Sequence, residues 1–128
     1  MRIRHLSIRN FRGIRELDWA LPDKPLFCLI GRGDSTKSTI LEGLRRVFYP
    51  QWNLTFDDAD FYQCIPVTTI TIDVILGDLV DSFRDLENYG QWLSEWDKGA
   101  LKRRNETAED AEDALWVRLR VADDLEPS

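Results

Sequence analysis

The stretch that decides the fold runs from residue 26 to residue 49 and reads LFCLIGRGDSTKSTILEGLRRVFY. Its first five residues are continuously apolar, which is typical of a strand buried on both faces of a sheet. Residues 38–49 follow a glycine-containing loop and form a helical pattern that ends before Pro50. The apolar stripe of this helix is expected to consist of Ile40, Leu41, Leu44, Val47 and Phe48. The order strand, loop, helix predicts an α/β fold.

The loop itself has the form of a phosphate-binding motif. Residues 31–38 follow the Walker A pattern G-x-x-x-x-G-K-S/T of a P-loop, with one departure. Backbone N–H groups of such a loop and of the helix that follows it surround an anion. Lys37 would bridge the β- and γ-phosphates, and the Ser38 hydroxyl would bind Mg²⁺ as the one metal ligand. The candidate cofactors are ATP and Mg²⁺, and the candidate binding residues are Gly31, Gly33, Asp34, Ser35, Thr36, Lys37, Ser38 and Thr39.

Two residues in the loop weigh against tight binding. Thr36 replaces the glycine before the lysine, and a β-branched residue is costly there if the position needs a positive φ. The Asp34 carboxylate would repel a triphosphate, so we expect it to point away or to meet another subunit. Two alternatives stay open at this point, an ordinary glycine-rich turn and a nucleotide site that survives only as a structural remnant.

The rest of the chain is richer in strands than in helices. Apolar residues at alternate positions predict strands within 3–11 (with an irregularity), 17–21, 70–76 and 115–121. Helices are expected at 78–89 and around Trp92 and Trp96, and residues 97–114 are expected to form an exposed loop or helix. We therefore expect a mixed sheet around the P-loop helix, with an antiparallel portion built from the first strands and those near 67–76 and 115–121. Further parallel strands that would complete the sheet are expected to be missing from this chain.

The charges are unevenly distributed along the sequence. Residues 1–50 hold 10 Lys and Arg against 5 Asp and Glu, whereas residues 51–128 hold 7 against 18. An anionic ligand is therefore expected in the first half, and a small basic nucleic-acid-binding module is a poor interpretation. No apolar run approaches the length of a membrane span, and no signal peptide is evident, which favours a cytoplasmic protein with free thiols.

A second motif lies near the N-terminus. Residues 10–14 read NFRGI, and the Walker A loop begins about twenty residues later. This combination resembles the N-terminus of ABC-type ATPases of the RecF, SMC and OLD group within the AAA family, and is most similar to OLD-family ATP-dependent endonucleases. The stretches 58–62 and 70–79 fit the same pattern. The resemblance implies that Arg12 lies beside the nucleotide; the alternative is a surface arginine at the end of a strand.

The resemblance implies a nucleotide-binding lobe of a protein of DNA repair, DNA processing or phage defence. Such ATPases hydrolyse ATP with a Walker B strand, a signature loop and a switch histidine, and we identify none of them, so no catalytic residue is assigned. Residues 115–124 are superficially like Walker B, but Arg118 and Arg120 indicate a half-exposed antiparallel strand. Hydrolysis would then need the rest of the head or a second subunit, and DNA would be reached through the full-length protein. Contact with a membrane is not expected.

We therefore interpret residues 1–128 as a single partial ATPase head. Residues 1–50 would supply strands, the P-loop and a helix, and residues 51–128 antiparallel strands, a helix and an acidic loop. The alternative is a non-catalytic interaction module that keeps a degenerate P-loop. Among smaller signals, His5 is expected on a strand surface. Asp57, Asp58 and Asp60 are expected in a solvated loop, with cation binding as the alternative.

Overall fold

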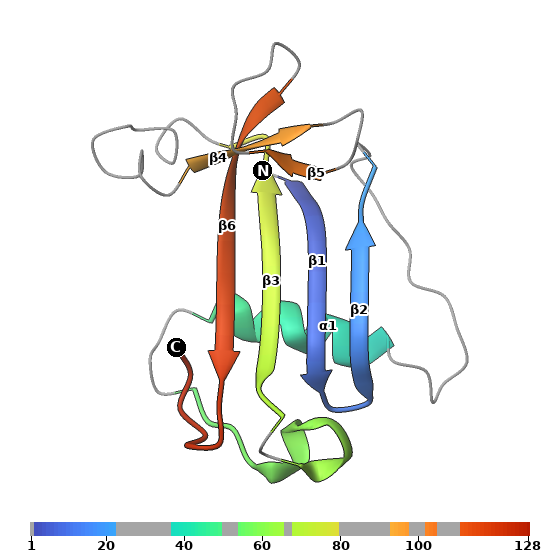
Figure 1. The fold of residues 1–128 in the computed structure, drawn as a ribbon, viewed down its shortest axis with the longest axis vertical. Coiled ribbons are helices and arrows are strands. Elements are labelled where there is room, and N and C mark those ends of the chain that lie inside the picture. Colours follow the sequence, from blue (N-terminus) through green and yellow to red (C-terminus); the bar gives the residue numbers. More distant parts are fainter. Residues whose placement is uncertain are drawn as a thin grey trace.

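The computed structural model describes residues 2–22, 37–49, 54–65, 68–79, 93–97, 102–104 and 111–128 (Figure 1). In these ranges six strands form one sheet in the order β2-β1-β3-β6-β4-β5. One α-helix, α1 (Lys37–Val47), lies across the long strands on one side of the sheet. The strands are β1 (Arg2–Phe11), β2 (Ile14–Ala20), β3 (Ile70–Gly77), β4 (Leu93–Asp97), β5 (Lys102–Arg104) and β6 (Ala111–Val121), and two short 3-10 turns are η1 (Asp58–Asp60) and η2 (Tyr62–Cys64).

The expected α/β fold, with a mixed sheet around the P-loop helix, is wrong. Every strand pair in the described ranges is antiparallel, and α1 is the one α-helix there. The physical reason lies in the alternation of the long strands, which bury one face and leave the other largely polar. A parallel sheet would need helices on both faces. The apolar segment 26–30, expected as a buried strand, lies outside the described residues.

Several elements agree with the sequence pattern. β1 carries the expected irregularity, because its pairing with β3 shifts register between Ile3 and His5. β3 covers the predicted strand at 70–76, and the antiparallel pairing of β1, β2, β3 and β6 is confirmed. β2 begins at Ile14, earlier than expected, because a two-residue turn at Arg12 and Gly13 lets Phe11 pair with Ile14.

The main core lies between α1 and the sheet. Gly43 of α1 faces the strands, where an added Cβ would lie 3.3 Å from Cδ1 of Ile8 and 3.5 Å from Cδ1 of Ile72. The missing side chain therefore allows the helix to approach the sheet closely. The predicted apolar stripe is only partly correct: Ile40, Leu44 and Val47 pack on the core, but Leu41 and Phe48 are 59% and 45% exposed. The fully buried sheet residues are Ile8, Phe11, Ile70, Ile72, Val74 and Val121.

β6 joins two parts of the sheet. Its residues 115–121 pair with β3, and its residues 111–115 pair with β4. Figure 1 shows β4 and β5 lying steeply across the end of the long strands. Trp96 of β4 is 1% exposed and packs with Ile75 and Ala114 on the face opposite α1. This short hairpin thus covers apolar surface that α1 does not reach.

Three expectations for this region are wrong. Trp96 lies in a strand and not in a helix, Lys102–Arg104 form strand β5 and not a loop, and β6 begins at Ala111 instead of residue 115. In each case strand pairing overrides the local sequence pattern. The expected helix at 78–89 falls almost entirely outside the described residues. No helix in the described part of the chain is long and apolar enough to cross a bilayer.

A buried ion pair joins the first and last strands. Arg4 of β1 donates from Nε and Nη2 to the two carboxylate oxygens of Glu112 of β6, the second contact measuring 3.1 Å. The pair passes over the backbone of Gly77 at the end of β3, where a Cβ would lie 2.7 Å from Arg4 Nε. Glu112 also accepts a hydrogen bond from the backbone N–H of Asp78. A Cβ at this position would therefore force the ion pair to shift.

Candidate nucleotide-binding site

The first turn of α1 contains the described part of the candidate site. Lys37, Ser38 and Thr39 open the helix, and its first turn holds no acidic residue. The first N–H groups of an α-helix have no partner within the helix, and its N-terminus carries partial positive charge. Ser38 is exposed, and the other two residues are half-buried. Ammonium, hydroxyl and backbone N–H donors together suit the oxygens of a phosphate group.

The loop that would complete the motif precedes the first described residue of α1. Gly31, Gly33, Asp34, Ser35 and Thr36 lie outside the described residues, so their roles stay predictions. For Mg²⁺, the Ser38 hydroxyl is a suitable oxygen ligand, because this ion commonly keeps several waters and takes the rest of its shell from substrate phosphates. Within the described ranges, no group of three His, Cys, Asp or Glu side chains could hold a metal ion.

The sheet holds α1 in a fixed position. Besides Gly43, the residues Ile40, Leu44 and Val47 pack against the core of β1, β3 and β6. At the other end of the helix, Arg45 and Arg46 occupy the last turn, where cations interact favourably with the partial negative charge. The C-terminal end therefore carries the type of charge that the helix dipole favours.

Arg12 does not lie beside the first turn of α1. It sits in the β1–β2 turn with a φ of 50°, and its backbone N–H donates to the carbonyl oxygen of Asp60 at 2.7 Å. Its Nε donates to Asp60 Oδ1 at 3.0 Å, and Arg46 Nη1 donates to Asp60 Oδ2 at 3.2 Å. Arg46 follows Lys37 by nine residues, which is about 13 Å along a helix. The described contacts therefore bring Arg12 to the last turn of α1 and not to Lys37.

The acidic cluster after α1 is organised around Asp60. Its buried carboxylate binds both arginines and also accepts the backbone N–H of Asp57 at 3.1 Å. Burial by itself would raise the pKa of Asp60, but the Asp57 hydrogen bond and the two arginines outweigh it and hold the pKa below its ordinary value. Asp57 and Asp58 are exposed, as expected for a solvated loop, whereas the expectation that Asp60 is solvated is wrong.

Glu42 extends this network along α1. It accepts hydrogen bonds from Arg45 at 2.6 and 2.9 Å and from Arg46 at 2.9 Å. The pKa of Glu42 is lowered to about 2, chiefly by the Arg45 hydrogen bond and against the opposing effect of burial, with Arg46 adding to the shift. Arg46 also lies over the rings of Phe11 and Phe56, 5.7 and 4.7 Å from their centroids. The spacing of Glu42 from the two arginines is the only sequence signal for this cluster.

Polar groups on the face opposite α1 are mostly paired with one another. His5, expected on a strand surface, contacts Asp18 and lies with its ring centroid 6.2 Å from that of Trp96. Asp73 accepts from Nε and Nη2 of Arg118 at 2.6 and 3.0 Å and from Trp116 Nε1 at 3.1 Å. Asp73 is thus neutralised by Arg118 in this part of the sheet.

Comparison with known protein families gives no match, and no curated protein matches the chain. The resemblance to OLD-type, RecF-type and SMC-type ATPases therefore rests on the sequence motifs at residues 10–14 and 31–38.

Proposed function

We propose that this chain binds ATP–Mg²⁺ at the first turn of α1, as the nucleotide-binding part of an OLD-, RecF- or SMC-like ATPase. The observation that supports it best is that α1 begins at Lys37, directly after the Walker A loop, with an acid-free first turn. The proposed setting is DNA processing, repair or phage defence in the cytoplasm. The proposal does not require the α/β sheet that was expected, because it rests on a loop and a helix start.

Each residue of the first turn has a defined part in this proposal. The helix N–H groups and the Lys37 ammonium would neutralise phosphate charge. The Ser38 hydroxyl would bind the metal ion, which supplies charge neutralisation at the β- and γ-phosphates when bound. The chain shows no Walker B acid and no signature loop in its sequence. We therefore expect binding without substantial hydrolysis until the remaining head or a second subunit supplies those groups.

Titration calorimetry with ATP–Mg²⁺ tests the proposal. The chain should bind saturably, and Lys37→Ala should weaken binding at least about tenfold. Arg120→Ala is the matched control, since Arg120 is an exposed cation whose strand position faces away from α1. Absence of binding by the folded chain, or equal binding by Lys37→Ala, would refute nucleotide binding at this site. Steady ATP turnover abolished by Lys37→Ala would refute the claim that the chain alone does not hydrolyse.

A second candidate is a non-catalytic interaction module, and the outer side of α1 favours it. Leu41 and Phe48 are exposed and lie seven residues apart, so they share one side of the helix. Sedimentation with and without ATP–Mg²⁺ separates the two functions. Self-association that ATP does not change, and that Leu41→Ser with Phe48→Ser abolishes, would favour the interaction module.

A further inference from the structure

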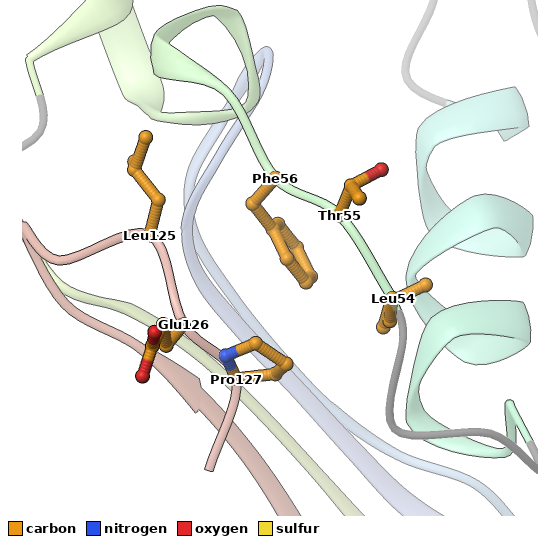
Figure 2. Close-up of a pocket in the computed structure, with 6 residues that line it drawn as sticks. All are labelled: Leu54, Thr55, Phe56, Leu125, Glu126 and Pro127. Atoms are coloured by element: carbon orange, nitrogen blue, oxygen red, sulfur yellow. The ribbon is translucent and has the colours of Figure 1, made fainter.

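A groove of about 300 Å³ lies between the loop after α1 and the C-terminal segment of the chain (Figure 2). Figure 2 shows the rings of Phe56 and Pro127 pointing into the space between the two segments. The Thr55 hydroxyl and the Glu126 carboxylate point away from it. The groove is lined by apolar side chains and by polar groups, and its lining residues are Leu54, Thr55, Phe56, Leu125, Glu126 and Pro127.

Both walls of the groove are held in place. Phe56 is buried, and Arg46 lies over its ring. The opposite wall is tied to β6, because Arg120 and Ser128 exchange two backbone hydrogen bonds of 2.9 and 2.8 Å. The turn between them is closed by the Leu125 N–H donating to the Ala122 carbonyl at 3.1 Å. A preformed groove lowers the entropic cost of binding.

Exposed carboxylates adjoin both walls of the groove in the sequence. Asp57 and Asp58 follow Phe56 directly, and Asp123, Asp124 and Glu126 lie within two residues of Leu125. All five carboxylates are exposed, and none has an ion-pair partner within the described ranges. Two of them accept hydrogen bonds from the backbone: Asp57 accepts from the N–H of Ala59, and Asp124 accepts from the N–H of Glu126. The neighbouring cation, Arg46, is already neutralised by Glu42 and Asp60. These two segments therefore carry uncompensated negative charge.

We propose that this groove binds a basic segment of a partner protein that carries an apolar side chain flanked by Lys or Arg. The apolar side chain would fill the space between Phe56 and Pro127, and the flanking cations would meet the five carboxylates. The same charges would repel nucleic acid and other polyanions. This site is separate from the first turn of α1, so the proposal stands or falls independently of nucleotide binding.

The test uses the whole 128-residue chain, labelled with ¹⁵N, and the capped peptide Lys-Lys-Leu-Phe-Lys-Lys. Saturable shifts are expected for the backbone amides of residues 54–56, 125, 126 and 128. Two further peptides serve as controls: Glu-Glu-Leu-Phe-Glu-Glu reverses the charge, and Lys-Lys-Ser-Ser-Lys-Lys removes the apolar side chains. Each should bind at least about fivefold more weakly, and added salt should weaken the first peptide.

A pair of matched variants separates site binding from general charge attraction. Asp123→Asn with Asp124→Asn and Glu126→Gln should weaken the basic peptide about fivefold or more. Glu16→Gln with Asp18→Asn and Asp78→Asn removes the same charge from exposed positions outside the lining residues and should leave the affinity within about twofold. Equal weakening by both variants, shifts away from the groove, or equal binding of the acidic or the serine peptide would overturn the proposal. All substituted residues of the first variant are at least partly exposed, so the fold should persist.

Discussion

Arg46 and Asp60 connect the last turn of α1 to the loop that follows it through a 3.2 Å ion pair that is almost completely buried. Asp60 also binds Arg12 from the β1–β2 turn, so one carboxylate holds three separate segments together. Two arginines and a backbone N–H bind this one buried acid, so its removal leaves Arg12 without its ion-pair partner and Arg46 with Glu42 alone.

The first prediction concerns Asp60. Asp60→Ala should lower the free energy of unfolding by about 3 kcal/mol, because two arginines lose their shared partner. Since the pKa of Asp60 is depressed in the folded state, its contribution is present above the unfolded pKa and is lost as pH falls through the folded value. Urea denaturation at pH 7 and at pH 3 measures both effects. Asp58→Ala, at an exposed position, should change stability by less than about 0.5 kcal/mol.

The second prediction concerns the titration of Glu42. Its side-chain carboxyl should titrate near pH 2 in an NMR experiment, well below the ordinary pKa of 4.5 for a glutamate. Arg45→Ala should raise this pKa, because the Arg45 hydrogen bond is the largest cause of the shift. Arg120→Ala, on the opposite face, should leave it unchanged. A Glu42 titration near its ordinary value in the unsubstituted protein would contradict the observed α1 network.

The third prediction concerns Gly77. A methyl group there would lie 2.7 Å from Arg4 Nε and still closer to Glu112 Oε1, so the buried ion pair would have to move. Gly77→Ala should therefore destabilise the protein by about 2–3 kcal/mol in thermal or urea unfolding.

A double-mutant cycle identifies the cause. In a Glu112→Ala background the same glycine substitution should cost clearly less, because one of the two crowded partners is gone. Full additivity of the two substitutions would argue against crowding by the ion pair.

The fourth prediction concerns Trp96, which attaches β4 to the sheet. Trp96→Ala should cost about 3–5 kcal/mol, because it removes a large buried side chain that packs on Ile75 and Ala114. Hydrogen exchange should show faster exchange in β4 and the first half of β6 than in β1 and β3. Trp96→Phe should keep part of the packing and lose less. Uniform protection of β4 in the alanine variant would contradict this role.

The long strands and α1 are predictable because their signals are local. β3 alternates apolar and polar residues over most of its length. α1 follows a helical pattern that Pro50 ends in the sequence, although the helix itself already ends at Val47. The P-loop motif favours a sheet with parallel strands, and this expectation is wrong for the described strands, which pair antiparallel. The alternation of apolar and polar residues in β3 and β6 instead predicts antiparallel strands, because burial of one face is typical of antiparallel sheets.

What could not be predicted depends on contacts between distant segments. β4 and β5 are short, and charged residues are frequent in their sequences, so only their pairing with β6 and with one another defines them. The same holds for Arg12 and Asp60, 48 residues apart, and for Arg4 and Glu112, 108 residues apart. Within the candidate site, Lys37, Ser38 and Thr39 lie in the first described turn of α1, and Arg12 contacts Asp60 beside its last turn.

The most direct measurement is ATP–Mg²⁺ binding by calorimetry for the unsubstituted chain, Lys37→Ala and Arg120→Ala, each checked for folding by circular dichroism. The account predicts saturable binding that is lost in Lys37→Ala and kept in Arg120→Ala. A folded chain that does not bind ATP–Mg²⁺, or that binds it equally well without Lys37, would contradict the account.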